Sequence, residues 1–379
     1  MARPTRALAV TLAGAALAGC SIFSGPSGPK PAELVSLPAG APVVRQVWRA
    51  HVGDADGFVF SPAFAADSVY AAGRSGTVVR LDAATGREIW RASLQMPLSA
   101  GVGTDGRTVA VGNEKGVVAA LEAGTGKLRW QARVSSEVLA PPAVGDGLVV
   151  VRSLDNRVFA FDAADGSRRW VYQRAPASLV VRVPSGVVLG KGTAYAAFRA
   201  GKLAAVALAN GGQRWEATVA LPKGATELER VTDVVGDPAL VGREVCAAAY
   251  QGRVGCFDAD SGRPLWTREL SSLTGVSVDA RYAFVSDENG AVHALDRASG
   301  RSIWRQDKLA HRQVTVPVPL GERVAVGDFE GYVHFLARDT GAFVERFATR
   351  DGAIAAPPLP LPSGLLVQTQ SGGLYVLEP

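Results

Sequence analysis

The sequence is poor in the residues from which metal centres and reactive sites are usually built. Its 379 residues include 3 cysteines, 4 histidines and 2 methionines. The histidines are His51, His293, His311 and His334, and they show neither metal-ligand spacing nor a neighbouring cluster of cysteines or carboxylates. His293 and His334 occupy the same column of a repeat described below, which is typical of structural strand residues. We therefore predict no metal site.

Motifs for catalysis and nucleotide binding are missing as well. The chain has no Gly-x-Ser-x-Gly elbow, phosphate loop or dinucleotide fingerprint. Charged residues make up 20% of the chain and are scattered, so no basic stripe for nucleic acid is present. The repeated units also lack the 3.6-residue apolar spacing of helices. These absences predict a protein without catalytic residues and without a nucleic-acid partner.

What the sequence does contain is one short stretch, repeated. Its cleanest copy runs from Gly76 to Trp90 and reads as a strand, a tight turn and the start of a second strand. Asp82 and Thr85 can accept hydrogen bonds from turn amides, and Gly86 can adopt a positive φ. The bulky Trp90 needs a buried environment, and packing between neighbouring units is the interpretation we favour for all 7 tryptophans.

The copies predict the fold. Five further copies keep the same distance between the leading residue and the tryptophan: Gly116–Trp130, Asn156–Trp170, Gly201–Trp215, Gly252–Trp266 and Gly290–Trp304. A seventh starts at Gly331 with Glu345 in the tryptophan position, and an eighth starts at Gly372 and stops at the chain end. A period near 40 residues with strand-turn-strand content is typical of a β-propeller with one four-stranded blade per repeat.

The incomplete eighth copy has a partner at the other end of the chain. Residues 43–49 contain Trp48 and read as a tryptophan strand with no turn before it. Joining this strand to the eighth copy completes the blade and closes the ring. We predict an all-β, eight-bladed β-propeller of four-stranded antiparallel blades, closed by an N-terminal strand.

The first residues carry a targeting signal. Arg3 and Arg6 precede an apolar run from Ala7 to Ala18, which is too short to span a bilayer. The run ends in Leu-Ala-Gly-Cys20, which resembles the bacterial lipobox and implies cleavage before Cys20 and its acylation. The alternative is an ordinary signal peptide with a chance cysteine, and we favour the lipoprotein. The predicted organisation is a signal peptide at 1–19, lipidated Cys20 with a flexible tether to 41, and the propeller at 42–379.

Two repeats are longer than the others. Extra residues at 174–185 precede the fourth unit, and extra residues at 220–233 precede the fifth. In repeat proteins such insertions are loops on one face, often the binding face. The second insertion mixes charged residues with Leu221, Leu228 and Val231, which suits an interaction edge. A solvated loop remains an equal alternative.

The other two cysteines, Cys246 and Cys256, fall on neighbouring strands of the fifth unit. A hairpin centred near Gln251 would place them opposite each other, within reach of a disulfide. An oxidising compartment would permit the bridge. A one-residue shift in register would instead leave two buried thiols, and both readings stay open.

The repeat resembles that of pyrroloquinoline-quinone dehydrogenases and their non-enzymatic relatives. Within that superfamily the chain resembles the BamB family, the lipoprotein subunits of the outer-membrane β-barrel assembly machinery. The resemblance rests on the lipobox, the eight units with N-terminal closure, residues 224–233, Leu309-Ala-His-Arg312, and Gly327-Asp-Phe-Glu-Gly-Tyr-Val-His334.

That resemblance implies a non-catalytic scaffold without a cofactor, lipid-anchored at the periplasmic face of the outer membrane. It implies binding to the periplasmic repeats of the barrel-inserting subunit BamA, and membership of a complex with other Bam subunits. The implied partner-binding residues lie on the two insertions: Leu179, Val181, Arg182, Glu227, Glu229, Arg230 and Asp233. Val235 stands where the family commonly has a second acid. Contact of a blade edge with unfolded outer-membrane proteins is a further alternative that the fold allows.

A different class of function shares the same superfamily. A quinone-dependent dehydrogenase would need a Ca²⁺ site, a stacking tryptophan in the central funnel, a catalytic aspartate and commonly an adjacent Cys-Cys pair. The two propeller cysteines here are ten residues apart. We therefore favour the scaffold over the dehydrogenase.

Overall fold

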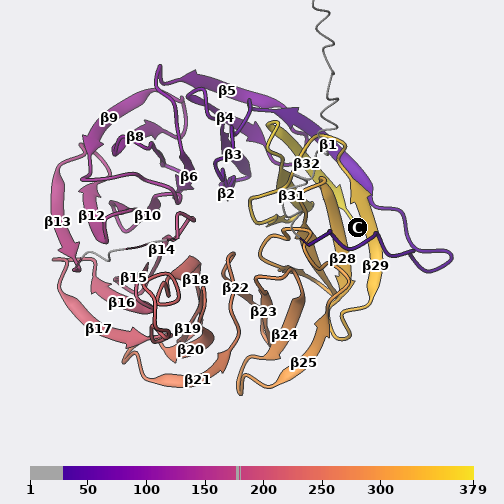
Figure 1. The fold of residues 1–379 in the computed structure, drawn as a ribbon. Coiled ribbons are helices and arrows are strands. Elements are labelled where there is room, and N and C mark those ends of the chain that lie inside the picture. The colour runs from indigo at the N-terminus through magenta and orange to yellow at the C-terminus, as the bar shows by residue number, and fades with distance from the viewer. Residues whose placement is uncertain (1–28, 176–178, 180) are drawn as a thin grey trace, which may run out of the picture. The chain divides into compact units, whose positions relative to one another are not determined.

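The structure, a computed structural model, describes residues 29–175, 179 and 181–379. Residues Pro31–Pro379 form one compact unit that contains eight four-stranded sheets. The sheets are arranged as blades around a central axis (Figure 1). The predicted eight-bladed β-propeller is thus confirmed. Within the described residues, no helix is long and apolar enough to cross a membrane.

The blades follow the chain in order, each from its innermost to its outermost strand. The first blade contains β2(Ala63–Ala65), β3(Ser68–Ala72), β4(Thr77–Asp82) and β5(Glu88–Ser93), and the second contains β6(Ala100–Thr104), β7(Thr108–Gly112), β8(Val117–Glu122) and β9(Leu128–Arg133). The third contains β10(Ala143–Gly145), β11(Leu148–Ser153), β12(Arg157–Asp162) and β13(Arg168–Gln173), and the fourth contains β14(Val187–Gly190), β15(Thr193–Phe198), β16(Lys202–Ala207) and β17(Gln213–Thr218). The last four are β18(Val234–Val241), β19(Glu244–Ala249), β20(Arg253–Asp258) and β21(Pro264–Glu269); β22(Val276–Val278), β23(Tyr282–Ser286), β24(Val292–Asp296) and β25(Ser302–Gln306); β26(Val318–Leu320), β27(Arg323–Gly327), β28(Tyr332–Ala337) and β29(Phe343–Ala348); and β30(Leu359–Leu361), β31(Gly364–Gln368) and β32(Gly373–Glu378) with β1(Arg45–His51).

The eighth blade is assembled from both ends of the unit. Its strand order is β1-β32-β31-β30, so the N-terminal strand is the outermost one. β1 runs antiparallel to β32, from Arg45 opposite Glu378 to His51 opposite Gly373. The predicted closure of the ring is confirmed. Pairing with β1 covers the backbone edge of β32, which the eighth blade would otherwise expose.

Burial decreases from the second strand of a blade to its outermost strand. β3, β7 and β15 are buried along their whole length. The outermost strands β5 and β9 are mostly exposed or half-exposed. This gradient follows from crowding near the axis, where neighbouring sheets cover both faces of each strand, and it accounts for the Ala- and Val-rich sequences of the inner strands.

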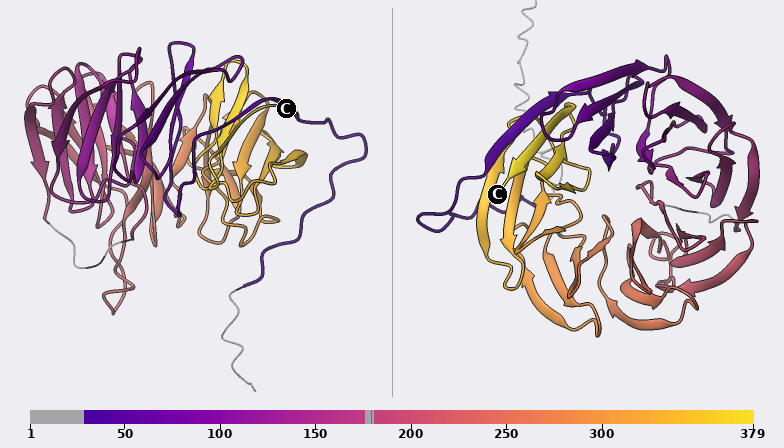
Figure 2. Two further views of the ribbon diagram at one scale, coloured as in Figure 1. Left: turned by 90° about the horizontal axis from the view of Figure 1, so that it is seen from above. Right: turned by 180° about the vertical axis from the view of Figure 1, so that it is seen from behind.

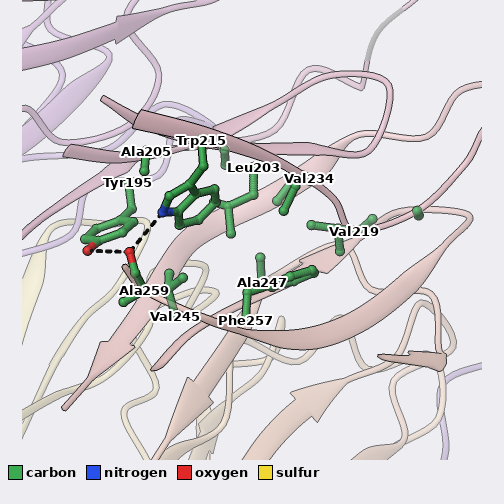
Figure 3. Close-up of a cluster of buried hydrophobic side chains, with 14 residues drawn as sticks. Tyr195, Leu203, Ala205, Trp215, Val219, Val234, Val245, Ala247, Phe257 and Ala259 are labelled. Atoms are coloured by element: carbon green, nitrogen blue, oxygen red, sulfur yellow. Dashed lines mark hydrogen bonds between the residues drawn. The ribbon is translucent and has the colours of Figure 1, made fainter. Parts of the chain in front are cut away.

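A tryptophan on each of seven outermost strands fastens one blade to the next. The indole Nε1 of Trp215 in β17 donates to the carbonyl oxygen of Ala259, in the turn after β20, at 2.9 Å (Figure 3). The Tyr195 hydroxyl donates to the same oxygen at 3.1 Å. The other six indoles bind the equivalent turn of the next blade: Trp48 to Ala83, Trp90 to Ala123, Trp130 to Ala163, Trp170 to Leu208, Trp266 to Arg297 and Trp304 to Arg338. The predicted interblade role of the tryptophans is confirmed.

The glycine of the repeat completes this junction. Gly166 has a φ of 76°, and a Cβ at this residue would lie 2.6 Å from the ring of Trp130. Each of the other six indoles likewise lies over the turn glycine of the following blade. The turn thus needs glycine for two reasons, its left-handed backbone and the close approach of the indole. Asp82 shows how the turn itself is held, since its carboxylate accepts from Thr85 N at 2.9 Å.

The seventh blade lacks the tryptophan because there is no complete turn in the eighth blade to receive it. Glu345 takes the tryptophan position in β29 and is fully buried. Its Oε1 accepts from Arg323 Nε and Nη2 at 2.9 and 2.6 Å. Beside this junction Val44 is buried against Phe335, Ile354 and Leu377. The residues before β1 therefore help to fill the one junction that has no indole.

The compact unit begins earlier than the sequence predicted. The predicted tether extends to residue 41, but Pro31–Ala41 belong to the propeller unit. Val35 and Leu37 pack against a buried cluster that includes Trp304 and Phe343. Apolar side chains at these two positions explain the difference. Cys20 and the predicted signal peptide lie outside the described residues.

The two propeller cysteines face each other, as the hairpin near Gln251 suggested. Cys246 in β19 is paired in register with Cys256 in β20. Their sulfur atoms lie 1.92 Å apart, and the structure joins them in a disulfide. Both residues are fully buried beside Trp266. We predict that the bridge also forms in protein made in an oxidising compartment.

The indole–glycine junction predicts unequal costs for two similar substitutions. Gly147→Ala places a Cβ on a turn residue with a φ of 75° and nothing within 4 Å. Gly166→Ala has nearly the same φ but drives its Cβ into Trp130. We expect Gly166→Ala to lower the free energy of unfolding by about 1–3 kcal/mol more than Gly147→Ala, the usual cost of overpacking. Urea denaturation measures both, and equal losses would contradict the indole contact.

The cysteine pair is tested in protein that starts at Pro31, so that Cys20 is absent, and that is purified from an oxidising compartment. After denaturation without reductant we expect no reactive thiol. Reduction should expose two thiols and lower the free energy of unfolding by about 2–3 kcal/mol, since the bridge closes a short loop. Thiol titration and denaturation with and without reductant give both results. A Cys246→Ala/Cys256→Ala variant serves as control, because reductant should leave its stability unchanged. Two free thiols in the unreduced protein would refute the bridge.

Candidate partner-docking site

The two insertions leave the propeller on the same face. In an antiparallel blade, the link from the fourth strand to the next blade emerges at the same end as the hairpin between the second and third strands. Residues 174–186 link β13 to β14, and residues 219–233 link β17 to β18. The left view of Figure 2 shows the second link projecting well beyond the strand ends. We call this side of the ring the docking face, and the opposite side, which carries the tryptophan-binding turns, the turn face.

Asp233 ties the two insertions together. Its carboxylate accepts from Val181 N at 2.9 Å and from Ala200 N at 3.3 Å. The residue is only 4% exposed. The sequence placed Asp233 among partner-contacting charges, but the structure buries it within the chain's own loops. Asp233 therefore holds Val181 and the hairpin at Ala200 in place, because a backbone N–H that loses its acceptor costs free energy.

Arg182 is presented at the surface by a second set of contacts. Its guanidinium donates through Nε and Nη2 to Glu137 Oε2, at 3.0 and 2.7 Å. The same group lies 5.4 Å from the ring centroid of Phe58. About half of the Arg182 side chain remains exposed. Neither Glu137 nor Phe58 was found from the sequence, since each comes from a different inter-blade link and no motif connects them to the insertion.

The apolar residues of the first insertion lie beside this arginine in the sequence. Leu179 is 46% exposed, while Val181 is partly buried. Residues 176–178 and 180 fall outside the described residues. The structure thus presents Leu179 and Arg182 to solvent and uses the backbone of Val181 for the bond to Asp233.

The tip of the second insertion is held by its own polar groups. Glu229 Oε2 accepts from Ala225 N and Thr226 N at 2.8 and 3.1 Å, and Glu229 N donates to Thr226 Oγ1 at 3.2 Å. The backbone N–H groups of Thr226 and Ala225 lower the pKa of Glu229, since they stabilise its charged form. Arg230 Nε donates to Gly224 O at 3.0 Å.

This self-contained turn leaves apolar side chains outside it. Leu221 is 60% exposed and Leu228 is 71% exposed. Glu227 lies 3.9 Å from Arg230 at the same exposed tip. Glu229 and Arg230, which the sequence assigned to partner binding, thus also stabilise the loop. An ordered loop with two exposed leucines and a charged rim has the composition of a protein-binding edge.

The ring also encloses a central channel. Its cavity of about 540 Å³ is lined mainly by valines, prolines and small residues of the innermost strands and their links. Asp237 is the one carboxylate among the described lining residues, and none of those residues is a tryptophan. The side chain of Asp237 is exposed to solvent in the channel, and the protein atoms around its carboxyl group partly desolvate the charged form and raise its pKa to about 6. Nor do the described residues contain a group of three or more His, Cys, Asp or Glu side chains that could hold a metal ion.

Comparison with known proteins identifies the family. The family model described as outer membrane protein assembly factor BamB matches residues 74–306. The protein of that name from Bordetella pertussis is 46% identical over 99% of this chain and 98% of its own length. The one from Pseudomonas aeruginosa is 45% identical over 95% of each chain. This chain belongs to the BamB family.

Solved structures agree with the assignment. The crystal structure of BamB from Moraxella catarrhalis superposes with a TM-score of 0.81 at 29% identity, over 89% of this chain and all of that one. The quinohemoprotein alcohol dehydrogenase of Comamonas testosteroni gives a TM-score of 0.70 at 12% identity, over 88% of this chain and 76% of that one. The second likeness shows a common fold alone. The resemblance to the BamB family drawn from the repeats and the insertions is confirmed.

The bonds of Asp233 in this BamB-family chain predict a local effect on backbone exchange. Asp233→Ala should speed hydrogen exchange at the amides of Val181 and Ala200 by about tenfold or more, since each loses a charged acceptor. Asp233→Asn keeps one carbonyl oxygen and should give an intermediate effect. NMR-detected exchange measures each amide, and Val117, whose amide donates to Asn113, is the remote control. Unchanged exchange in Asp233→Ala would show that the carboxylate does not hold these loops.

Proposed function

We propose that this protein is a non-catalytic assembly factor of the outer-membrane β-barrel assembly machinery, and that it works by docking. Family membership supports the assembly role, because its relatives bear the name outer membrane protein assembly factor. The observation that carries the docking mechanism is the pair of insertions joined by Asp233 on one face of the ring. A propeller gives such loops a rigid base.

The proposed partner is the barrel-inserting subunit BamA, engaged through its periplasmic repeats. Leu179 and the leucines of the second insertion would supply apolar anchors, while Arg182 would supply a directional charge. Arg182 already forms an ion pair with Glu137. A carboxylate from the partner could share or replace Glu137 with little loss of free energy, because an exposed ion pair contributes only about 0–1 kcal/mol to stability.

The proposed location is the periplasmic face of the outer membrane, with Cys20 carrying the lipid anchor. The Leu-Ala-Gly-Cys20 sequence after a short apolar run supports this placement. Because the residues from Pro31 onwards belong to the propeller unit, only the part of the predicted tether before Pro31 would connect the lipid to the ring.

Charge reversal on the docking face tests the mechanism. Arg182→Glu should weaken co-purification with BamA and raise the apparent dissociation constant by about tenfold or more, because it replaces the exposed cation with a second acid beside Glu137. Arg87→Glu makes the same charge change at an exposed site on the turn face and should have no effect. Pull-down from solubilised membranes and titration with purified BamA repeats give the two readouts.

The fold must be intact for this comparison to count. Circular dichroism and the exchange of the Val181 amide should be the same in Arg182→Glu as in the wild type. Equal binding by Arg182→Glu and wild type would remove Arg182 from the docking site. Absence of any binding by the wild type would refute BamA as the partner.

A further inference from the structure

One sequence motif has no place in the docking site. It consists of Arg312, in the link between β25 and β26, and the residues Asp328, Glu330 and His334 around the hairpin from β27 to β28. Arg312 is 3% exposed, and both Asp328 and His334 are fully buried. Buried charged groups of this kind need partners, and their partners show what the motif does.

The motif holds the segment that precedes β1. Arg312 Nη1 donates to the carbonyl oxygen of Ala32 at 2.9 Å, and Ala32 N donates to Ala310 O at 2.9 Å. Three residues later, Arg346 Nη2 in β29 donates to the carbonyl oxygen of Val35 at 2.6 Å. Val35 and Leu37 pack on the buried cluster between the sixth and seventh blades. We call residues 32–37 the docked segment.

The two arginines are connected to each other beneath the docked segment. Asp328 Oδ2 accepts from Arg312 Nε at 2.7 Å and contacts His334 Nε2 at 2.9 Å. On the other side of the imidazole, His334 Nδ1 accepts from Arg346 Nε at 3.2 Å. The path from the carbonyl of Ala32 to that of Val35 is therefore an unbroken chain of hydrogen bonds. Such a chain fixes both guanidinium groups before they meet the segment.

The protonation state of His334 follows from these contacts. Nδ1 can accept from Arg346 only if the ring is neutral, with its proton on Nε2 towards Asp328. Burial lowers the pKa of His334, in the direction that favours the neutral form. Glu330 completes the network by binding the remaining nitrogen of Arg312.

The sixth unit provides an internal comparison. It has the same aspartate–histidine pair, with His293 Nε2 2.9 Å from Asp287 Oδ2. The residue equivalent to Arg346 is Arg305, because His293 faces Arg305 across the strands as His334 faces Arg346. Arg305 turns to Asp307 instead, at 3.0 Å. The pair alone is thus a strand feature of the repeat, and in the seventh unit Arg312 and Arg346 also reach a second segment.

We infer that Arg312 and Arg346 form a binding site for an extended main chain, and that its ligand is the chain's own docked segment. The site binds carbonyl oxygens through two guanidinium groups and side chains through the apolar cluster that receives Val35 and Leu37. The segment becomes part of the propeller, and its first residues lie at links and hairpins of the docking face.

Hydrogen exchange of the full-length, lipidated protein in detergent tests the inference without any partner. In the wild type, peptides covering residues 31–37 should exchange far more slowly than an unstructured chain. Arg312→Met and Arg346→Met should each speed their exchange by about tenfold to a hundredfold, the effect of losing a charged hydrogen bond. Peptides of β1 should be unchanged. Arg305→Met is the matched control and should leave residues 31–37 protected.

A variant of the segment itself covers the case in which Arg312→Met disturbs folding, since that change leaves Asp328 without its guanidinium partner. Ala32→Pro removes the N–H that bonds Ala310 and leaves the side chains of Arg312, Asp328 and His334 in place, so it should release the segment while the ring stays folded. Unprotected residues 31–37 in the wild type would overturn the inference, as would unchanged protection in folded Arg312→Met and Arg346→Met. Neither result depends on BamA, so failure here is distinct from failure of the docking proposal.

Discussion

The propeller depends on one repeated contact, in which the indole of one blade lies on the turn glycine of the next and donates to the carbonyl of that turn. Each of the first six repeats supplies both halves, the turn to the blade before it and the tryptophan to the blade after it. Seven such junctions carry the chain from Trp48 around to Trp304. The contact joins a large buried ring to a satisfied polar atom, so each blade is fixed in position and orientation at once. Loss of either half affects two blades.

The eighth junction shows how the constraint is met where the repeat fails. In the eighth blade the outermost strand β1 comes from the N-terminal part of the chain, so no turn joins β32 to it, and Glu345 stands in place of the indole. A buried carboxylate needs a partner, and Arg323 supplies it. Val44 then fills apolar space at the same junction. Ring closure thus relies on strand pairing by β1 and on local packing, and the residues on both sides of β1 contribute to it.

Because the junctions lie on the turn face, the docking face is free to vary. Insertions there lengthen links between blades without touching an indole or its glycine. Both long insertions and Arg312 occur on that side, and the docked segment starts there. This separation explains how a fold shared with a quinohemoprotein alcohol dehydrogenase at 12% identity can serve a different function. The ring sets the shape, and the links set the chemistry.

The sequence predicted the features that repeat and missed those that occur once. Blade number, ring closure and the role of Trp90 and its equivalents follow from periodic spacing, which averages out local ambiguity. The burial of Asp233 does not, because its partners Val181 and Ala200 are 52 and 33 residues away and obey no period. The contact of Arg346 with Val35 spans 311 residues. The two aspartate–histidine pairs could have been predicted, since an aspartate stands six residues before both His293 and His334 and an alignment of the repeats shows this shared spacing.

The contacts of the docking face also limit how it can bind. Arg182 and Glu137 are already paired, and Glu229 and Arg230 already hold their own loop, so these charges have little unsatisfied attraction to offer a partner. Exchange of one exposed ion pair for another changes the free energy by about 1 kcal/mol or less. In the proposed docking, the net gain in binding free energy would therefore come from burial of the leucines. Full burial of an exposed leucine contributes about 1.5–3 kcal/mol, and these partly exposed side chains would contribute less. Specific orientation then depends on the charges, and affinity depends on how well the loops are fixed before binding. Asp233 holds both insertions through Val181 and Ala200, so in the proposed docking this buried residue would govern the strength of the interface.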